Sequence, residues 1–223
     1  MFVRKIFILL FVFFIHISSY AQISSQAKEL KPDFFANIND SLKKAYGNNK
    51  IIPKEYELSI LAALANYPEL IEVKIEFKYK AIKTTMAARP VPSFIVKKNN
   101  KRKYIILINN KNKNHNTVLL SKVPFNARVG VIAHELGHIV DYESKNKLGI
   151  LKTGIGYLFK QSKKCLESKI DIIAINHGLG WQLFDYSYFI LYKSKASEEY
   201  KKYKKENYFH PQEVLFIQQL GCI

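Results

Sequence analysis

The sequence predicts an α+β fold in a single domain. Apolar residues recur at helical spacing near the start and through the second half of the chain, whereas short runs with alternating apolar residues are grouped between positions 72 and 109. Strands that are grouped in this way, and not interleaved with helices, favour a short mixed sheet packed against helices. A chain of 223 residues is long enough to bury one proper core.

The first segment has the pattern of a secretory signal peptide. Two basic residues precede an apolar run at 6–15, and the small residues Ser19 and Ala21 stand at the third and first positions before an expected cut. Ten apolar residues are too few for a helix to cross the roughly 30 Å of hydrocarbon in a bilayer. We therefore expect a leader at 1–21, cleavage after Ala21, a mature domain at 22–223, and export to the periplasm or the medium. An uncleaved anchor is the alternative.

The rest of the chain is predicted to form helices and strands that support a central helix near 126–143. The patterns predict helices at 23–46 and 56–65 and strands at 72–79, 93–96, 104–109 and 117–120. The last of these is a candidate edge strand that leads into the central helix. Beyond Gly180, aromatic and charged runs predict a long helix across 181–206, and Pro211 starts a final helix that runs to Leu220.

Residues 134–138 read His-Glu-Leu-Gly-His, a complete HExxH motif. Histidines four residues apart lie on one face of a helix, so His134 and His138 can bind one Zn²⁺ together. Glu135 would then stand beside the open coordination position, where it can take a proton from water as a general base. The motif therefore predicts the core of a zinc-dependent hydrolytic site.

The surroundings of the motif favour a real helix over a chance match. Asn126 is a plausible N-cap, and the helical pattern runs to about Glu143. Apolar residues at helical spacing around the motif anchor this helix in a core: Val131, Ile132, Leu136, Ile139 and Val140.

A catalytic zinc needs a third protein ligand. The extended HExxHxxGxxH motif is absent, because Asp141 and Ser144 replace its glycine and its third histidine. A second helix is expected downstream, with Ser162 as its N-cap and an end near 177–178.

Two carboxylates, Glu167 and Asp171, share one face of that second helix beside its apolar stripe. Partial burial of carboxylates costs desolvation free energy unless a cation binds to them, and Zn²⁺ is such a cation. The alternative is a solvated helix face on which the carboxylates lie near Lys163, Lys164 and Lys169.

HELGH followed by ExxxD on a second helix resembles the gluzincin class of metallopeptidases, the thermolysin-like enzymes; the similarity covers about 104–181. The resemblance implies that His134, His138 and Glu167 are zinc ligands and that Glu135 is the general base. It implies that Asp171 accepts a hydrogen bond from a ligand histidine, which fixes the tautomer. It also implies a small zincin-like fold in which an edge strand, here 117–120, lies along the cleft and binds an extended peptide by strand addition.

Gluzincins commonly add a His or Tyr that stabilises the oxyanion. His177, Tyr186, Tyr188 and His210 are eligible by residue type, and the sequence does not choose among them. Helix ends explain both histidines adequately, and core packing explains both tyrosines.

After export, Cys165 and Cys222 would be located in an oxidising compartment. A disulfide between them and two free thiols are equally compatible with the sequence. Zinc binding by Cys165 is disfavoured, because it would displace the paired carboxylates.

The formal net charge of +17 comes mainly from scattered lysines. Nucleic-acid binding is disfavoured, because it needs an organised basic stripe with aromatic or arginine readers. We expect solvated surface, with at most weak attraction to an anionic envelope surface.

Two functions follow from these patterns. The first is an exported zinc metallopeptidase that acts on peptide or protein substrates; the second is a catalytically silent, peptidase-like zinc-binding module of the cell envelope. The intact Glu135 favours the hydrolase.

Overall fold

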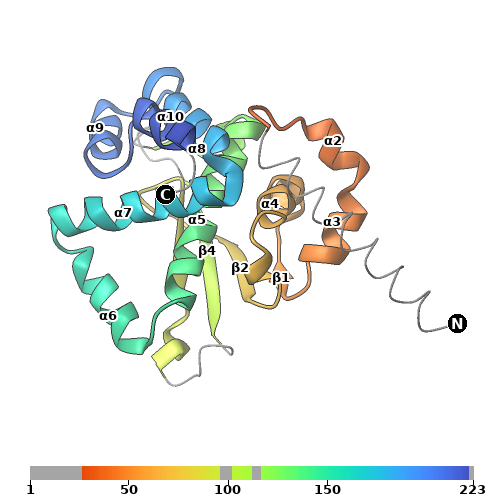
Figure 1. Cartoon of the computed structure of the whole chain (residues 1–223), viewed down its shortest axis with the longest axis horizontal. Helices are drawn as coiled ribbons and strands as arrows, with labels where there is room; N and C mark the ends of the chain where they lie inside the picture. The colour runs from red at the N-terminus through yellow and green to blue at the C-terminus, as the bar shows by residue number, and fades with distance from the viewer. Residues whose placement is uncertain (1–26, 96–101, 112–116, 221–223) are drawn as a thin grey trace, which may run out of the picture.

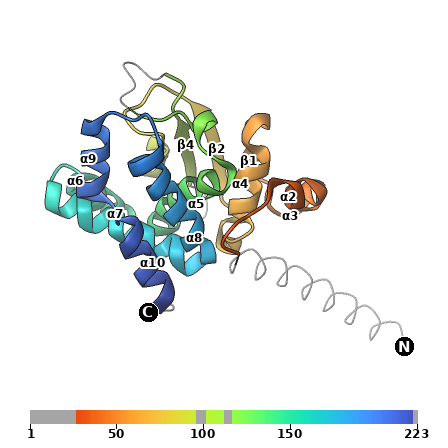
Figure 2. The ribbon, with the colours of Figure 1, turned by 90° about the horizontal axis from the view of Figure 1, so that it is seen from above.

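The computed structural model describes residues 27–95, 102–111 and 117–220 (Figures 1 and 2). The predicted leader lies outside these residues and stays a prediction. Among the described residues, no helix is both long and apolar enough to cross a membrane.

The described residues form an α+β fold with one small mixed sheet. Four strands lie in the order β1-β2-β4-β3, with β1 parallel to β2, β2 parallel to β4, and β3 antiparallel to β4. Their bounds are β1 Lys50–Ile51, β2 Lys74–Tyr79, β3 Met86–Pro90 and β4 Lys103–Ile108. In β2 the alternation buries Ile75 and Phe77 and leaves Lys74 and Lys78 exposed and Glu76 partly exposed, as expected for a half-buried strand.

Helix α5 carries the HExxH motif, and other helices lie on both sides of it. In both views α2 and α3 lie at one end of the molecule and α6, α7 and α9 at the other, with α5 between them (Figures 1 and 2). Their bounds are α2 Pro32–Asn37, α3 Asn39–Tyr46, α4 Glu57–Leu64, α5 Phe125–Glu143, α6 Lys147–Gly156, α7 Lys160–Ala174, α8 Gly180–Tyr188, α9 Glu198–Asn207 and α10 Pro211–Leu220.

One continuous core joins the sheet to α4 and α5. Fully buried side chains from each part meet there, among them Ile60, Leu61, Ile106, Ile132 and Leu136. Helix α5 packs against α4, α7, α8 and β3, so it is held on several sides. The HExxH motif therefore stands on a rigid element.

Three sequence predictions for the strands and the edge need correction. Residues 93–95 form part of a 3₁₀ turn, Pro92–Ile95, and not a strand. Residues 117–120 form no strand and lead into a 3₁₀ turn, Leu120–Lys122. The edge strand beside α5 is β3, which the sequence analysis missed because its Met-Ala-Ala-Arg-Pro segment is poor in β-branched residues. Pairing with β4 makes it a strand, and its edge position tolerates Pro90.

Some helix predictions also differ from the structure. The described part of the first region, 27–46, contains two helices that are separated at Ile38, and 181–206 is divided between α8 and α9. Asn126 lies inside α5 and not at its N-cap, which is Pro124. Its amide bonds instead to Leu30, Lys28 and Asp185, so it ties α5 to the segment before α2 and to α8. The helix predicted from Pro211 to Leu220 is confirmed.

Candidate metal centre

Helix α5 presents His134 and His138 on one buried face. Their relative exposures are only 5% and 8%, and Leu136, on another side of the helix, is fully buried in the core. The two imidazole rings are 4.9 Å apart and nearly perpendicular. The spacing of four residues therefore brings both rings to one point, as expected for a helix.

Helix α7 crosses α5 at this face and supplies two buried carboxylates, Glu167 and Asp171. The close crossing depends on Gly137. A Cβ atom there would lie 3.1 Å from Cγ2 and 3.3 Å from the carbonyl oxygen of Ile170, the residue next to Asp171. The glycine within the motif thus lets α7 approach the histidines.

Glu167 completes a group of three buried donor atoms. Its Oε2 lies 3.1 Å from Nε2 of His134 and 3.6 Å from Nε2 of His138. One ligand atom from each of the three residues lies within 4.8 Å of the others, so the group could hold a metal ion. Two imidazole nitrogens and one carboxylate oxygen are donors that Zn²⁺ accepts in catalytic sites.

Asp171 fixes the orientation of His134. Its Oδ1 lies 2.7 Å from Nδ1 of His134, and its Oδ2 accepts the backbone N–H of Phe209 at 3.1 Å. When Nδ1 carries the hydrogen, Nε2 turns its lone pair towards Glu167. Two acceptors would then face each other across 3.1 Å unless a positive charge lies between them.

The electrostatics of His134 agree with a centre that favours a cation. Burial alone would lower its pKa, but the hydrogen bonds to Asp171 and Glu167 outweigh burial and raise the pKa to about 10. Burial would raise the pKa of Glu167, yet its bonds to the two histidines hold that pKa well below the usual range. A metal ion would take the place of the proton on Nε2. The donor set therefore fits a divalent cation.

Glu135 lies beside this group and is held by the sheet. Its Oε2 accepts the backbone N–H of Ala88 in β3 at 2.5 Å, and the side chain is 5% exposed. The carboxylate is therefore fixed to the edge strand and lines the same cleft as His138 and Glu167.

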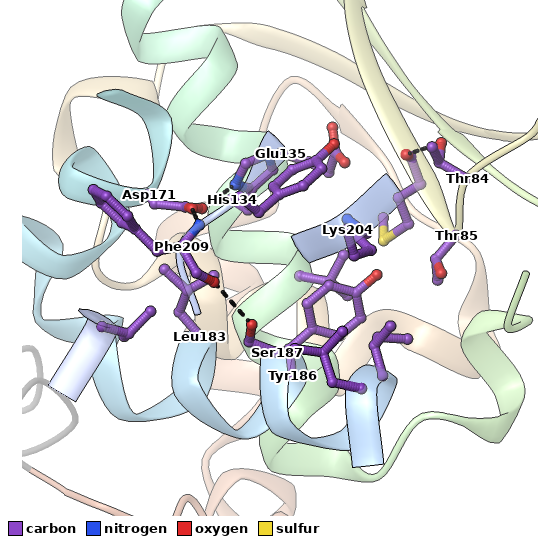
Figure 3. Close-up of a pocket in the computed structure, with 16 residues that line it drawn as sticks. Thr84, Thr85, His134, Glu135, Asp171, Leu183, Tyr186, Ser187, Lys204 and Phe209 are labelled. Carbon is purple, nitrogen blue, oxygen red and sulfur yellow. Dashed lines mark hydrogen bonds and ion pairs between the residues drawn. The ribbon is translucent and has the colours of Figure 1, made fainter. Parts of the chain in front are cut away.

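An open cleft of about 770 Å³ leads to these side chains. Its walls are β3 on one side and α6 with the following turn on the other; Glu135, His138 and Glu167 lie among its lining residues. A small cavity of about 30 Å³ is also lined by His134, Glu135 and Asp171 (Figure 3). A ligand in the cleft would thus meet the glutamate and the donor group together.

Three residues that the sequence analysis did not single out surround the centre. The Tyr157 hydroxyl lies 3.5 Å from Nδ1 of His138, and burial together with the charge of Glu167 raises the pKa of this phenol, which keeps it neutral. The Tyr208 ring lies 5.4 Å from the His134 ring. Lys204 places its ammonium 3.6 Å from the centre of the Tyr208 ring and lines the small cavity with Tyr186 (Figure 3).

Lys204 is a cation close to the centre. Burial lowers its pKa, but the surrounding tyrosines and Glu167 outweigh burial and raise the pKa, so the ammonium keeps its proton. In the sequence Lys204 cannot be told apart from its neighbours Lys201, Lys202 and Lys205, so no motif marks it.

The four candidates for oxyanion stabilisation lie in different places. Tyr186 is buried and lines the small cavity beside Glu135. His177 lies elsewhere, stacked on Tyr67 and within 2.6 Å of Oε1 of Glu69. Tyr188 is 39% exposed, and the backbone N–H of His210 bonds to Glu213; neither residue lines the cleft or the cavity.

Cys165 is exposed on α7 and stands outside the group of metal donors. Its predicted partner, Cys222, lies outside the described residues, so the disulfide stays a prediction.

Comparison of the chain with known protein families, with curated proteins and with solved structures found no match. Any function must therefore be argued from the residues of the centre and of the cleft.

Proposed function

We propose that this protein is a zinc-dependent peptidase with a gluzincin-like site on a small zincin-like domain. One observation carries the proposal. Two imidazole nitrogens and a carboxylate oxygen converge at the end of an open cleft, with the carboxylate of Glu135 beside them. An exported location is proposed with it, on the basis of the signal-peptide pattern at 1–21.

His134, His138 and Glu167 would hold the zinc ion. Bound Zn²⁺ would supply Lewis acidity, which lowers the pKa of water and polarises a carbonyl oxygen. Asp171 keeps the Nε2 lone pair of His134 directed at the donor group through the bond to Nδ1. The Tyr157 hydroxyl is placed to accept a weaker bond from His138.

Glu135 moves the protons of the reaction. As water oxygen attacks the carbonyl carbon of the scissile amide, Glu135 accepts a proton from that water. The same carboxyl group then gives the proton to the amide nitrogen while the C–N bond breaks. The N–H of Ala88 holds the carboxylate in place and leaves its other oxygen available.

Strand β3 supports an extended peptide as the substrate. It is one of the two edge strands of the sheet in the described part of the chain, and residues 86–90 all line the cleft. The backbone of an edge strand offers hydrogen-bonding groups to a further strand. The Ala88 N–H already bonds to Glu135, so an extended peptide in the cleft would pair with other backbone groups of β3.

The experiment compares Glu135→Gln with Glu143→Gln. Both residues lie on α5, but Glu143 bonds to Tyr104 and does not line the cleft. Both variants should retain one zinc ion per chain, because neither residue belongs to the donor group. Against a mixed peptide library, Glu135→Gln should lower the hydrolysis rate by about 10²–10⁴-fold, whereas Glu143→Gln should not.

Two outcomes would contradict the proposal. An unchanged rate in zinc-loaded Glu135→Gln would exclude Glu135 as the base. A zinc-loaded wild type that cleaves no peptide or other amide would favour a zinc-binding module of the cell envelope instead.

A further inference from the structure

An exposed apolar stripe runs along α6 and the turn that follows it. We define the α6 stripe as Leu148, Leu151, Ile155, Leu158 and Phe159, whose relative exposures are 67%, 46%, 58%, 80% and 61%. The surfaces of monomeric soluble proteins rarely expose so many large apolar side chains in one patch, and such patches mark interaction sites. Both views place α6 at the periphery, at the end of the molecule away from α2 and α3 (Figures 1 and 2).

Three residues of the α6 stripe lie on one face of the helix because of their spacing. Positions 148, 151 and 155 fall within an arc of about 60° when each residue turns the helix by about 100°, and Leu158 and Phe159 follow in the turn after Gly156. The opposite face holds the helix on the domain through the buried Ile150 and Thr153, whose hydroxyl accepts a bond from the Lys145 ammonium. Helix α6 is therefore fixed by one face and offers the other to a partner.

The segment that carries the α6 stripe is basic. Residues 144–166 contain six lysines and no Asp or Glu. Lys160 pairs with Glu206, and Lys145 pairs with Asp141, while Lys152 and Lys164 are exposed. The partner of this surface should therefore combine an apolar interior with a negative rim.

We propose that the α6 stripe binds the surface of a bilayer that contains anionic phospholipids. Apolar side chains on one helix face enter the boundary between head groups and acyl chains, and flanking lysines attract the anionic head groups. Helix α6 has ten residues, which gives a length of about 15 Å, so it would lie along the membrane surface.

This orientation places the cleft at the membrane. Leu151, Ile155 and Leu158 belong to the α6 stripe and also line the cleft. With α6 on lipid, the cleft would open next to the bilayer, where it would meet membrane-associated segments. Membrane binding through the α6 stripe does not depend on whether the cleft hydrolyses peptides.

Tryptophan probes test the contact at α6 separately from any contact made by the leader. Trp181 is the single tryptophan of the chain, so full-length Trp181→Phe provides a background without tryptophan. Into it we would introduce Phe159→Trp or, as the matched control, Phe216→Trp on α10. The two phenylalanines are equally exposed, at 61% and 62%.

Vesicles with about 30% phosphatidylglycerol should shift the emission of the Phe159→Trp protein to the blue, and brominated lipid should quench it. The Phe216→Trp protein should show neither change. Adding Lys152→Glu and Lys164→Glu to the first protein should weaken binding by at least about 25-fold, and purely zwitterionic vesicles should bind far more weakly.

Lack of quenching of the Phe159→Trp protein by anionic vesicles would overturn the proposal. Equal quenching in the double lysine variant would overturn the role of the lysines. A blue shift caused by an apolar peptide, with no response to vesicles, would assign the α6 stripe to the substrate cleft instead of to lipid.

Discussion

Nδ1 of His134 and Oδ1 of Asp171 lie 2.7 Å apart, and the second oxygen of the same carboxylate accepts the N–H of Phe209. Asp171 thus joins a histidine on α5 to its own helix, α7, and to the backbone just before α10. The imidazole is held in one orientation from behind, so Nε2 remains directed at Glu167.

Asp171→Asn should lower zinc affinity by about 10- to 100-fold. The amide keeps the shape of the side chain but removes the negative charge that supports the Nδ1–H of His134. Competition with a chromogenic chelator measures the change. Asp141→Asn is the control, because Asp141 is a buried acid on α5 that pairs with Lys145 and Lys169 and touches no member of the donor group. An equal loss of affinity in both variants would contradict a specific role for Asp171.

Glu167→Ala should remove stoichiometric zinc binding, because two histidines alone make an incomplete site for zinc. Metal analysis of the purified protein gives the zinc content per chain. Cys165→Ser is the matched control on the same helix, since this thiol is exposed and two residues away. If Glu167→Ala retained full zinc while Asp171→Ala lost it, the two carboxylates would have exchanged the roles proposed here. Zinc loss in Cys165→Ser would instead make the thiol a ligand.

The sequence predicts the five polar residues of the centre because their spacing is local. His134 and His138 are four residues apart on one helix, and so are Glu167 and Asp171 on another, so each pair shares a helix face before any tertiary contact forms. The structure places the two pairs together across the α5–α7 crossing.

Contacts between segments that are far apart in the sequence cannot be predicted from local spacing. Lys204 and Tyr208 reach the centre from α9 and its end, and no periodic signal connects them with α5. Strand β3 exists because β4 pairs with it, and its own residues are poor strand formers. Helix α6 received no prediction because three glycines, at 149, 154 and 156, weaken its helical pattern.

The pair of His177 and Glu69 should make stability depend on pH. Burial lowers the pKa of His177, but its bonds to Glu69 and to the Ile173 carbonyl outweigh burial and raise it; burial raises the pKa of Glu69, but the bond to His177 outweighs it and lowers that pKa. A histidine whose pKa is raised in the folded protein stabilises the folded state fully below its pKa in the unfolded chain, about 6.5. This stabilisation is lost as pH rises through the folded pKa. A glutamate whose pKa is lowered stabilises the folded state above its pKa in the unfolded chain, about 4.5. This stabilisation is lost as pH falls through the folded pKa.

Wild type should therefore exceed Glu69→Gln in free energy of unfolding most clearly near pH 5.5 and least near pH 9. The expected difference at the lower pH is only about 0.5 kcal/mol, because the Glu69 side chain is 42% exposed and solvent screens the pair. Urea unfolding with chelator present measures both values. A difference that grew towards pH 9 would contradict the raised pKa of His177.

Gly130→Ala and Gly154→Ala should change stability in opposite directions, although both glycines lie within helices. At Gly130 a Cβ atom would lie 2.0 Å from the carbonyl oxygen of Gln182 and 2.7 Å from the nitrogen of Leu183, both backbone atoms of α8 that have no room to yield. The substitution should push α8 away from α5 and lower the free energy of unfolding by about 3 kcal/mol or more. At Gly154 no atom lies within 4 Å of the added Cβ. There alanine should stabilise α6 by about 0.5–1 kcal/mol, because its helix propensity exceeds that of glycine. Urea unfolding of the zinc-free proteins gives both values, and a stable Gly130→Ala protein would show that α5 and α8 do not meet as closely as the structure places them.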